Sequence, residues 1–309
     1  MSEVAVAPRL PASGARADAG REELVVVPLR RRWRWVVPAV LVLLAVQVGR
    51  LVIENPRFRW DVIGRYLFSE QILEGLFLTV WLTLVTMAIG LVLGTLLAVM
   101  RQSRSRLTAW ASRTYVWFFR GTPVLVQLIV WYNLAALFPT YSIGIPFGPT
   151  LFEGSFNDLV TPITAAILGL ALNEGAYMAE IVRAGIQSVH ADQHEASRAL
   201  GMTPLLSMRR IILPQALHFI VPPTGNETIG MLKTTSLVSV IALYDLLYSA
   251  QSIYSRNYET IPLLLVASFW YLVATTVFSG LQRLIEGRVR RGTHGSAGSA
   301  GFAFRKALR

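Results

Sequence analysis

The 309-residue sequence contains no cysteine and little charge. Without cysteine the chain has neither a disulfide framework nor thiolate metal ligands. Charged residues make up 15% of the chain, well below the roughly 25% typical of soluble domains. The histidines show no zinc-type spacing with carboxylates; they are His190, His194, His218 and His294. These absences argue against a disulfide-rich secreted domain, an ordinary soluble enzyme and a metal site.

Apolar residues are abundant and occur in long runs. They make up 53% of the chain, and the mean hydropathy is +0.49. A run of about 20 apolar residues can cross the ~30 Å hydrocarbon core of a bilayer. The sequence therefore predicts an all-α polytopic membrane protein with about six transmembrane helices, at roughly Val36–Ile53, Ile72–Met100, Thr122–Phe138, Thr161–Val182, Pro214–Leu243 and Ile261–Leu281.

The distribution of basic residues predicts the topology. A net charge of +11 would suit nucleic-acid binding if the basic residues formed one patch. With both termini placed in the cytoplasm, however, 23 of the 29 basic residues fall in cytoplasmic segments. Lysine and arginine collect on the cytoplasmic side of membrane proteins. The charge therefore indicates orientation, and no nucleic-acid partner is expected.

The segments outside the spans have compositions of their own. Residues 1–35 are rich in Ala, Gly, Pro and charge, which predicts a disordered basic tail. Residues 284–309 are expected to form a basic cytoplasmic tail. Residues 107–118 mix aromatic and polar side chains, which favours a helix lying along the headgroup layer. Residues 139–160 are rich in Gly and Pro, which predicts an irregular outer loop.

Two predicted spans contain polar groups that lipid would not accept. In the fifth, the adjacent Pro222 and Pro223 predict an interrupted helix, because proline lacks a backbone N–H and clashes with the preceding turn. Polar residues in a span usually face an interior or a cavity, and interrupted helices commonly carry transporter binding sites. The candidate translocation-path residues are Glu174, Asn226, Glu227, Lys233 and Ser236. A purely structural role for Glu174 stays equally open, and Glu180 is expected to pair with Arg183 at the cytoplasmic interface.

The cytoplasmic segment between the fourth and fifth spans has a regular pattern. Residues 194–201 predict a short helix, Gly-Met-Thr-Pro predicts a turn, and the residues up to Pro214 predict a second short helix. No phosphate loop is present, because Met231 and Leu232 follow Gly225–Gly230 where Lys and Ser or Thr are required. No nucleophile–base arrangement is evident either. The chain therefore has no evident catalytic chemistry of its own.

This cytoplasmic segment resembles the "EAA" loop of bacterial ABC importer permeases. The matching residues are Glu195, Ala196, Ser197 in place of the second alanine, Gly201, Ile211, Leu213 and Pro214. Other stretches resemble polar amino-acid uptake permeases, the family for histidine, glutamate, glutamine, arginine and opines. They include Arg120–Pro123, Gly175–Tyr177, Arg183–Ile186 and Lys233–Leu237. The resemblance covers about residues 70–283, and residues 36–53 are an additional N-terminal transmembrane helix.

The resemblance implies the type I permease fold in a bacterial cytoplasmic membrane. It also implies a second permease subunit, identical or not, a cytoplasmic ABC ATPase dimer, an extracytoplasmic solute-binding protein and an amino-acid substrate. ATP and magnesium would bind the ATPase, and this chain would hold no cofactor and have no ATPase site. The implied ATPase-coupling residues are Glu195, Ala196, Ala199, Leu200, Gly201, Ile211, Leu213 and Pro214. The small residues permit close approach of a partner, and Leu200 can insert into a groove.

A stand-alone amino-acid carrier driven by an ion gradient is the alternative function. It would use Glu174 and the fifth segment as a proton or sodium site. No internal inverted repeat supports a carrier, and the patterned cytoplasmic loop would have no role in one. A scaffold or receptor subunit would not need polar groups in two spans. The sequence leaves the identity of the amino acid open.

Overall fold

The computed structural model describes residues 35–144 and 150–306, with side chains at 35–142 and 152–289. The chain divides after Pro56 into two units. The predicted tail of residues 1–35 lies outside the described residues except for Trp35.

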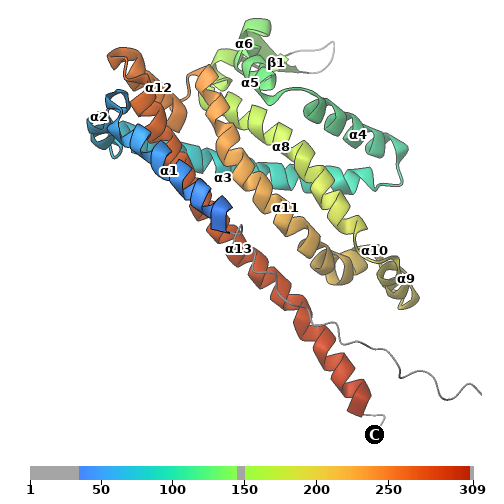
Figure 1. The fold of residues 1–309 in the computed structure, drawn as a ribbon. Coiled ribbons are helices and arrows are strands. Elements are labelled where there is room, and N and C mark those ends of the chain that lie inside the picture. Colours follow the sequence, from blue (N-terminus) through green and yellow to red (C-terminus); the bar gives the residue numbers. More distant parts are fainter. Residues whose placement is uncertain (1–34, 145–149, 307–309) are drawn as a thin grey trace, which may run out of the picture. The chain divides into compact units, whose positions relative to one another are not determined.

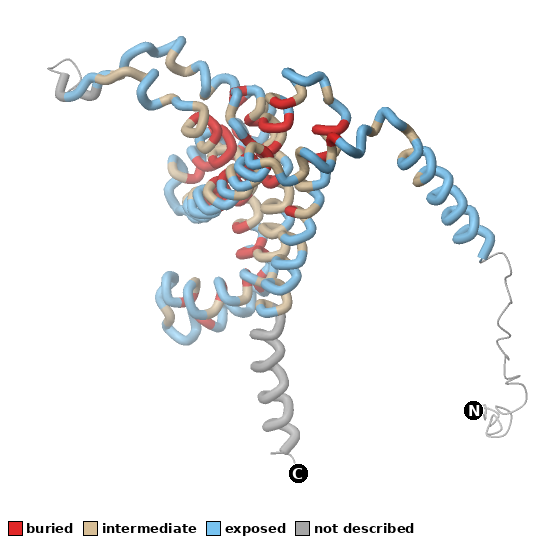
Figure 2. The backbone as a smooth tube through the Cα atoms, turned by 90° about the vertical axis from the view of Figure 1, so that its left-hand side faces the viewer, coloured by how far each residue is buried: buried red, intermediate tan, exposed pale blue. Residues whose placement is uncertain are grey.

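The first unit contains one helix, α1 (Val36–Glu54). Its most apolar stretch has a mean hydropathy of 2.4, and none of its residues is buried within the chain. In Figure 2 this helix is exposed along nearly all of its length. A mostly apolar helix of 19 residues that is exposed along nearly all of its length has the length and surface of a membrane span. It coincides with the predicted first span.

The second unit is a helical bundle with one small sheet (Figure 1). Its first half contains η2 (Pro56–Phe58, which begins at the boundary), α2 (Trp60–Tyr66), α3 (Glu70–Arg101), α4 (Arg106–Gly121), α5 (Val124–Tyr132), α6 (Leu134–Leu137), β1 (Thr140–Gly144), β2 (Thr150–Ser155) and α7 (Phe156–Leu159). Its second half contains α8 (Pro162–Gln187), α9 (Ala191–Ala199), α10 (Pro204–Ser207), η3 (Met208–Ile212), α11 (Leu213–Thr234), η4 (Thr235–Ile241), α12 (Leu246–Asn257) and α13 (Thr260–Lys306).

Four helices of the described residues are long and apolar enough to cross a membrane: α1, α3, α8 and α13 up to Val289. A fifth span results if residues 204–241 and α12, which meet at a bend of 44°, are taken together. The predicted third span, Thr122–Phe138, is divided into α5 and α6, of nine and four residues. Neither helix alone can cross a ~30 Å core at ~1.5 Å per residue. The count of six therefore remains a prediction, whereas the all-α membrane fold is confirmed.

The helices α3 and α8 pack closely at the centre of the bundle. A Cβ atom on Gly94 would lie 2.8 Å from the backbone nitrogen of Ala179, and one on Gly90 would lie 2.7 Å from Cγ of Glu174. Small residues four apart let membrane helices approach to backbone contact. Around this pair, Leu82, Leu128 and Leu170 are fully buried in one cluster with residues of α11 and η4. Figure 2 shows the buried residues gathered in the interior of the bundle.

The predicted interruption at Pro222 and Pro223 is wrong, because α11 continues through both prolines. Two missing N–H groups weaken the helix there without ending it, since neighbouring helices in a bundle can provide other hydrogen bonds to the freed groups. Gln282 of α13 donates from Nε2 to the Pro222 carbonyl at 3.3 Å. This bond connects α13 to α11 beside the prolines and does not replace a bond that the prolines remove, since those bonds would end on the carbonyls of residues 218 and 219. The backbone changes course further on, where η4 ends at Ala242 with φ +57°.

The outer loop is more regular than the sequence predicts. The strands β1 and β2 form an antiparallel hairpin in which Thr140 pairs with Ser155 and Tyr141 with Gly154. The loop therefore contains a sheet where an irregular segment was expected. Pro146, Gly148 and Pro149, which contributed to that expectation, lie outside the described residues. The hairpin and α12 lie at one end of the bundle, and α9 and α10 lie at the opposite end (Figure 1).

Candidate functional site

The segment from α9 to η3 (residues 191–212, here the helical loop) has the predicted helix–turn–helix form. Its turn depends on Gly201, whose φ is +71°. The N–H of Met202 donates to the Ser197 carbonyl at 3.1 Å, and the N–H of Gly201 donates to the Arg198 carbonyl at 2.9 Å. These are the two hydrogen bonds of a Schellman motif, which ends a helix with a left-handed residue. No heavy atom lies within 4 Å of a Cβ built on Gly201, so backbone conformation alone favours glycine.

The return from the turn is also determined locally. The Thr203 hydroxyl accepts from the Leu206 N–H at 3.4 Å, and Pro204 occupies the first turn of α10. Proline suits that position because its missing N–H would have no partner there. The helix widens to π geometry over η3 and then continues as α11. The turn is thus joined to a candidate span by continuous helical backbone.

A buried pair of hydroxyl groups connects the two halves of the helical loop. The Ser207 hydroxyl donates to the Ser197 hydroxyl at 2.7 Å, and Ser197 donates to the His194 carbonyl at 2.9 Å. Both side chains are buried, with exposed fractions of 3% and 8%. Sequence reasoning treated Ser197 only as a small replacement for alanine. A serine ten residues further on was the available signal.

The helical loop is attached to the bundle by one apolar cluster. Ile212 is buried with Val182 and Ile186 of α8, Ala98 of α3, and Ala216 of α11. Ile211 packs against the same cluster. Of the predicted coupling residues, Ile211 therefore faces the bundle.

The remaining predicted coupling residues face outward. Leu200 is 79% exposed, and Leu205, which sequence reasoning did not select, is 78% exposed. Glu195, Ala196, Ala199 and Pro214 are exposed, and Leu213 is 39% exposed. Exposed leucines beside small residues form a surface suited to a partner's groove. The arrangement combines an outward apolar surface with a buried attachment.

Glu174 is the most buried of the predicted path residues. It is 3% exposed in α8, and its Oε1 atom has no hydrogen-bond partner within the described residues. Glu227 of α11 lies close enough to repel the Glu174 carboxylate, and Arg120 at the end of α4 attracts that of Glu227. The Arg120 guanidinium also lies 5.0 Å from the centre of the Tyr177 ring. Three helices thus bring charged groups together beside Glu174.

The other predicted path residues, Asn226 and Lys233 of α11 and Ser236 of η4, lie near α13. Asn226 accepts from Gln282 of α13 at 3.2 Å. Lys233 and Ser236 line a pocket of about 380 Å³ with Tyr271 and other residues of α13. The structure therefore brings Glu174 and Glu227 together and places the other three toward α13.

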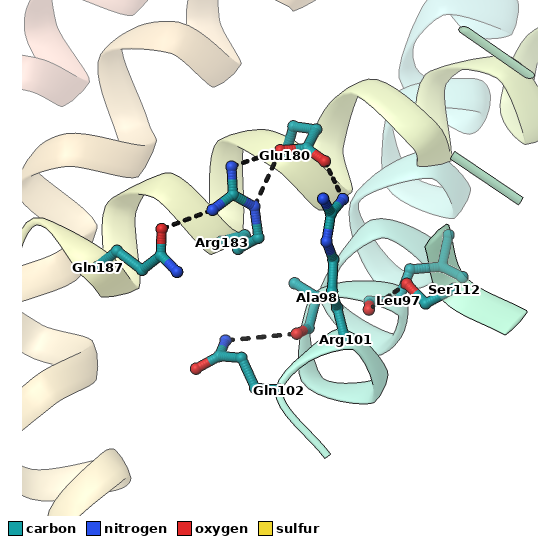
Figure 3. A network of polar contacts seen from close by, with 8 residues as sticks. All are labelled: Leu97, Ala98, Arg101, Gln102, Ser112, Glu180, Arg183 and Gln187. Carbon is teal, nitrogen blue, oxygen red and sulfur yellow. Dashed lines mark hydrogen bonds and ion pairs between the residues drawn. The ribbon is translucent and has the colours of Figure 1, made fainter. Parts of the chain in front are cut away.

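Glu180 pairs with Arg183 as predicted, and a second arginine joins them (Figure 3). Arg183 donates to Oε2 of Glu180 from Nε at 2.9 Å and from Nη2 at 2.7 Å. Arg101, the last residue of α3, donates to Oε1. Sequence reasoning missed Arg101 because the pairing crosses between two helices. The network ties the end of α3 to α8.

The described residues contain no group of His, Asp or Glu side chains able to hold a metal ion. The candidate site consists of an exposed apolar surface at one end of the bundle and a buried group of ionisable side chains within it.

Comparison with known proteins places this geometry in a family. Residues 90–291 match the model of the binding-protein-dependent transport system inner membrane component. The arginine transport system permease protein ArgU of Corynebacterium glutamicum is 43% identical over 267 residues, which cover 86% of this chain and 83% of that protein. The L-cystine transport system permease protein TcyB of Bacillus subtilis is 36% identical, with 75% and 92% covered.

A solved structure is similar as well. The crystal structure of an amino acid ABC transporter with histidines has a TM-score of 0.60 and 39% identity, and the match covers 71% of this chain and 94% of that chain. The chain belongs to the family of binding-protein-dependent transport system inner membrane components, and it is a permease subunit of an ABC importer.

Proposed function

We propose that this permease takes up an amino acid with a cationic side chain and uses ATP hydrolysed by a separate ATPase dimer. ATP and magnesium would bind that dimer, and this chain would contribute the path and the coupling surface. The relatives named for arginine and cystine transport support an amino-acid substrate. The buried carboxylate of Glu174 beside Glu227 supports a positively charged one.

The observation that supports the coupling role best is the contrast within the helical loop. Leu200 is 79% exposed, whereas Ile212, twelve residues later and joined to it by a hydrogen-bonded turn, is 1% exposed. A partner that binds Leu200 can therefore move α11, because the hydrogen-bonded turn and the continuous helical backbone connect the two. For ATP binding to drive transport, the ATPase must contact this surface differently in its open and closed states.

The coupling role is tested with Glu195→Lys in proteoliposomes that contain the permease, its ATPase and its binding protein. ATP-dependent uptake is expected to be abolished while the variant remains in the membrane. Arg65→Gln, a change of one charge unit at an exposed position of α2, serves as the control and is expected to transport normally. Normal uptake by Glu195→Lys would contradict the coupling role.

The substrate class is tested by competition. Labelled arginine uptake is measured with unlabelled arginine, cystine, glutamine and glutamate as competitors. A Glu174→Gln variant is expected to lose at least tenfold in arginine uptake, since the change removes a carboxyl group that could ionise and pair with a guanidinium when substrate binds. Unchanged transport by Glu174→Gln would remove this residue from the path.

The assembly and orientation complete the proposal. The permease would pair with a second permease subunit, receive substrate from a binding protein on the outer side, and hold both termini in the cytoplasm. Because the chain lacks cysteine, single cysteines at Ser2 and Ala307 can be labelled with an impermeant maleimide in intact cells and in permeabilised cells. Labelling only after permeabilisation is expected. Uptake by the purified chain under a proton or sodium gradient alone would instead support the carrier.

A further inference from the structure

A basic pocket lies where α3 ends and α4 begins. It has a volume of about 760 Å³ and is lined by four arginines, Arg101, Arg104, Arg106 and Arg113, together with Leu107 and Trp110. None of the residues that line it is acidic. We propose that this pocket binds the phosphate headgroup of an anionic phospholipid, with the acyl chains lying along the aromatic face of α4.

Three of the four arginines form no ion pair within the part of the chain that the structure describes. Arg101 shares the Glu180 carboxylate with Arg183, so its charge is only partly balanced. Arg104, Arg106 and Arg113 are exposed, and no carboxylate of the described residues forms an ion pair with them. Guanidinium groups bind phosphate with charge-assisted, often bidentate hydrogen bonds. The pocket therefore has an excess of positive charge and the donors that phosphate needs.

The level of the pocket fits the headgroup layer. It begins at Arg101, where the 32-residue apolar helix α3 ends. Arginine at the end of a span lies at the membrane interface, and tryptophan is enriched at the same level. Basic pockets between helices at this level bind lipid headgroups.

The adjacent face of α4 fits acyl chains. Leu107, Trp110 and Trp117 are exposed by 75%, 63% and 75%. Their spacing of three and seven residues places them on one face of the helix. Arg106 and Arg113, seven residues apart, form the neighbouring stripe. The opposite face, with Ala109, Ser112, Val116 and Phe119, is buried. A ligand with both a phosphate and an apolar chain matches this pattern, whereas free phosphate would use only half of it.

The absence of an acidic lining residue selects the headgroup. Zwitterionic phospholipids carry an ammonium group, which gains nothing from a pocket lined only by arginines. An anionic headgroup such as that of phosphatidylglycerol has a net negative charge, which can pair with the arginines of the pocket. Each arginine near the surface favours an anionic lipid by about fivefold, so three unpaired arginines give a preference on the order of a hundredfold.

The test uses the full-length chain in vesicles of phosphatidylglycerol and phosphatidylcholine, with one or the other lipid brominated on its acyl chains. Bromine quenches the fluorescence of nearby tryptophan. The difference in fluorescence between the wild type and Trp110→Phe is the contribution of Trp110. The quenching of Trp110 by each brominated lipid gives the relative affinity of the pocket for that lipid. This affinity is expected to be on the order of a hundredfold higher for phosphatidylglycerol than for phosphatidylcholine. In Arg104→Gln/Arg106→Gln, with one unpaired arginine left, the preference is expected to fall to the order of fivefold.

The matched control is Arg65→Gln/Arg256→Gln, which removes two exposed charges at the opposite end of the bundle and is expected to keep the full preference. Equal quenching by both lipids, or an unchanged preference in Arg104→Gln/Arg106→Gln, would overturn the proposal. Loss of the preference in 10 mM inorganic phosphate would assign the pocket to a free anion. If the double variant keeps the preference but no longer assembles with the ATPase, the arginines serve a protein contact instead.

Discussion

Gly201 separates two reasons for which a residue of the helical loop can matter, its backbone conformation and its contact with a partner. Its φ of +71° lies in the left-handed region, and no heavy atom lies within 4 Å of a Cβ built on it. Gly201→Ala therefore adds conformational strain of about 1 kcal/mol and no clash with the described part of the chain. That energy corresponds to about a fivefold change in an equilibrium. Uptake is expected to fall by no more than that factor.

Two nearly isosteric variants extend this series. Asparagine and aspartate both enter the left-handed region more readily than alanine, so Gly201→Asn is expected to transport almost as well as the wild type. Gly201→Asp has the same backbone tolerance but places a negative charge at the C-terminal end of α9, where the helix dipole is already negative. It also charges the exposed surface beside Leu200. Gly201→Asp is therefore expected to abolish uptake.

The assay is the initial rate of ATP-dependent arginine uptake in proteoliposomes, normalised to the amount of assembled complex. Gly64→Ala is the control, because Gly64 also has open space around its Cβ position but lies in α2 without a positive φ. It is expected to leave uptake unchanged. If alanine and asparagine at position 201 are as damaging as aspartate, the conformational argument is refuted. A partner would then need the space that glycine leaves.

Three further substitutions test the packing around the site. Ser197→Ala leaves the buried Ser207 hydroxyl without its acceptor and is expected to destabilise the helical loop by about 1–3 kcal/mol, measured as faster hydrogen exchange over α9; replacing both serines should cost less. Gly94→Leu forces α3 away from α8 and is expected to lower the Tm in detergent by many degrees or prevent folding. Glu180→Gln removes the charge that Arg101 and Arg183 share, and we expect a loss of about 1–2 kcal/mol in thermal unfolding.

Matched changes control these experiments. Gly280→Leu lies in α13 with no heavy atom within 4 Å of its Cβ position and is expected to leave the Tm unchanged. Glu54→Gln breaks the exposed pair with Arg50 and should have little effect. The packing argument fails if Gly94→Leu behaves like Gly280→Leu. It also fails for the serine pair if the single and double alanine variants are equally destabilised.

The sequence could not predict the pairings that cross between helices. Glu180 and Arg183 are three residues apart in one helix, so their ion pair follows from local spacing. Arg101 contacts the same carboxylate from α3, although it lies 79 residues away along the chain. Nothing in a single sequence indicates that these two residues are close in space. The same limit applies to the group around Glu174, where Arg120 and Glu227 come from two other helices.

Local rules also failed where neighbouring helices override them. The prolines at 222 and 223 predicted a break, but α11 continues through both of them. Proline costs a helix two hydrogen bonds here, and packing against other helices can outweigh that cost.

The sequence by itself determined the membrane class, the position of the helical loop and the resemblance to importer permeases. These follow from hydropathy, from the distribution of charge and from residue types at fixed spacing, which are all local along the chain. Only the tertiary structure decided which side of the helical loop is exposed and that Ser197 is buried against Ser207. It also decided that Glu174 lies near Glu227, whereas Lys233 lines a separate pocket beside α13. The physical reason is that exposure and charge pairing depend on which helices pack together, and helix packing is a property of the whole bundle.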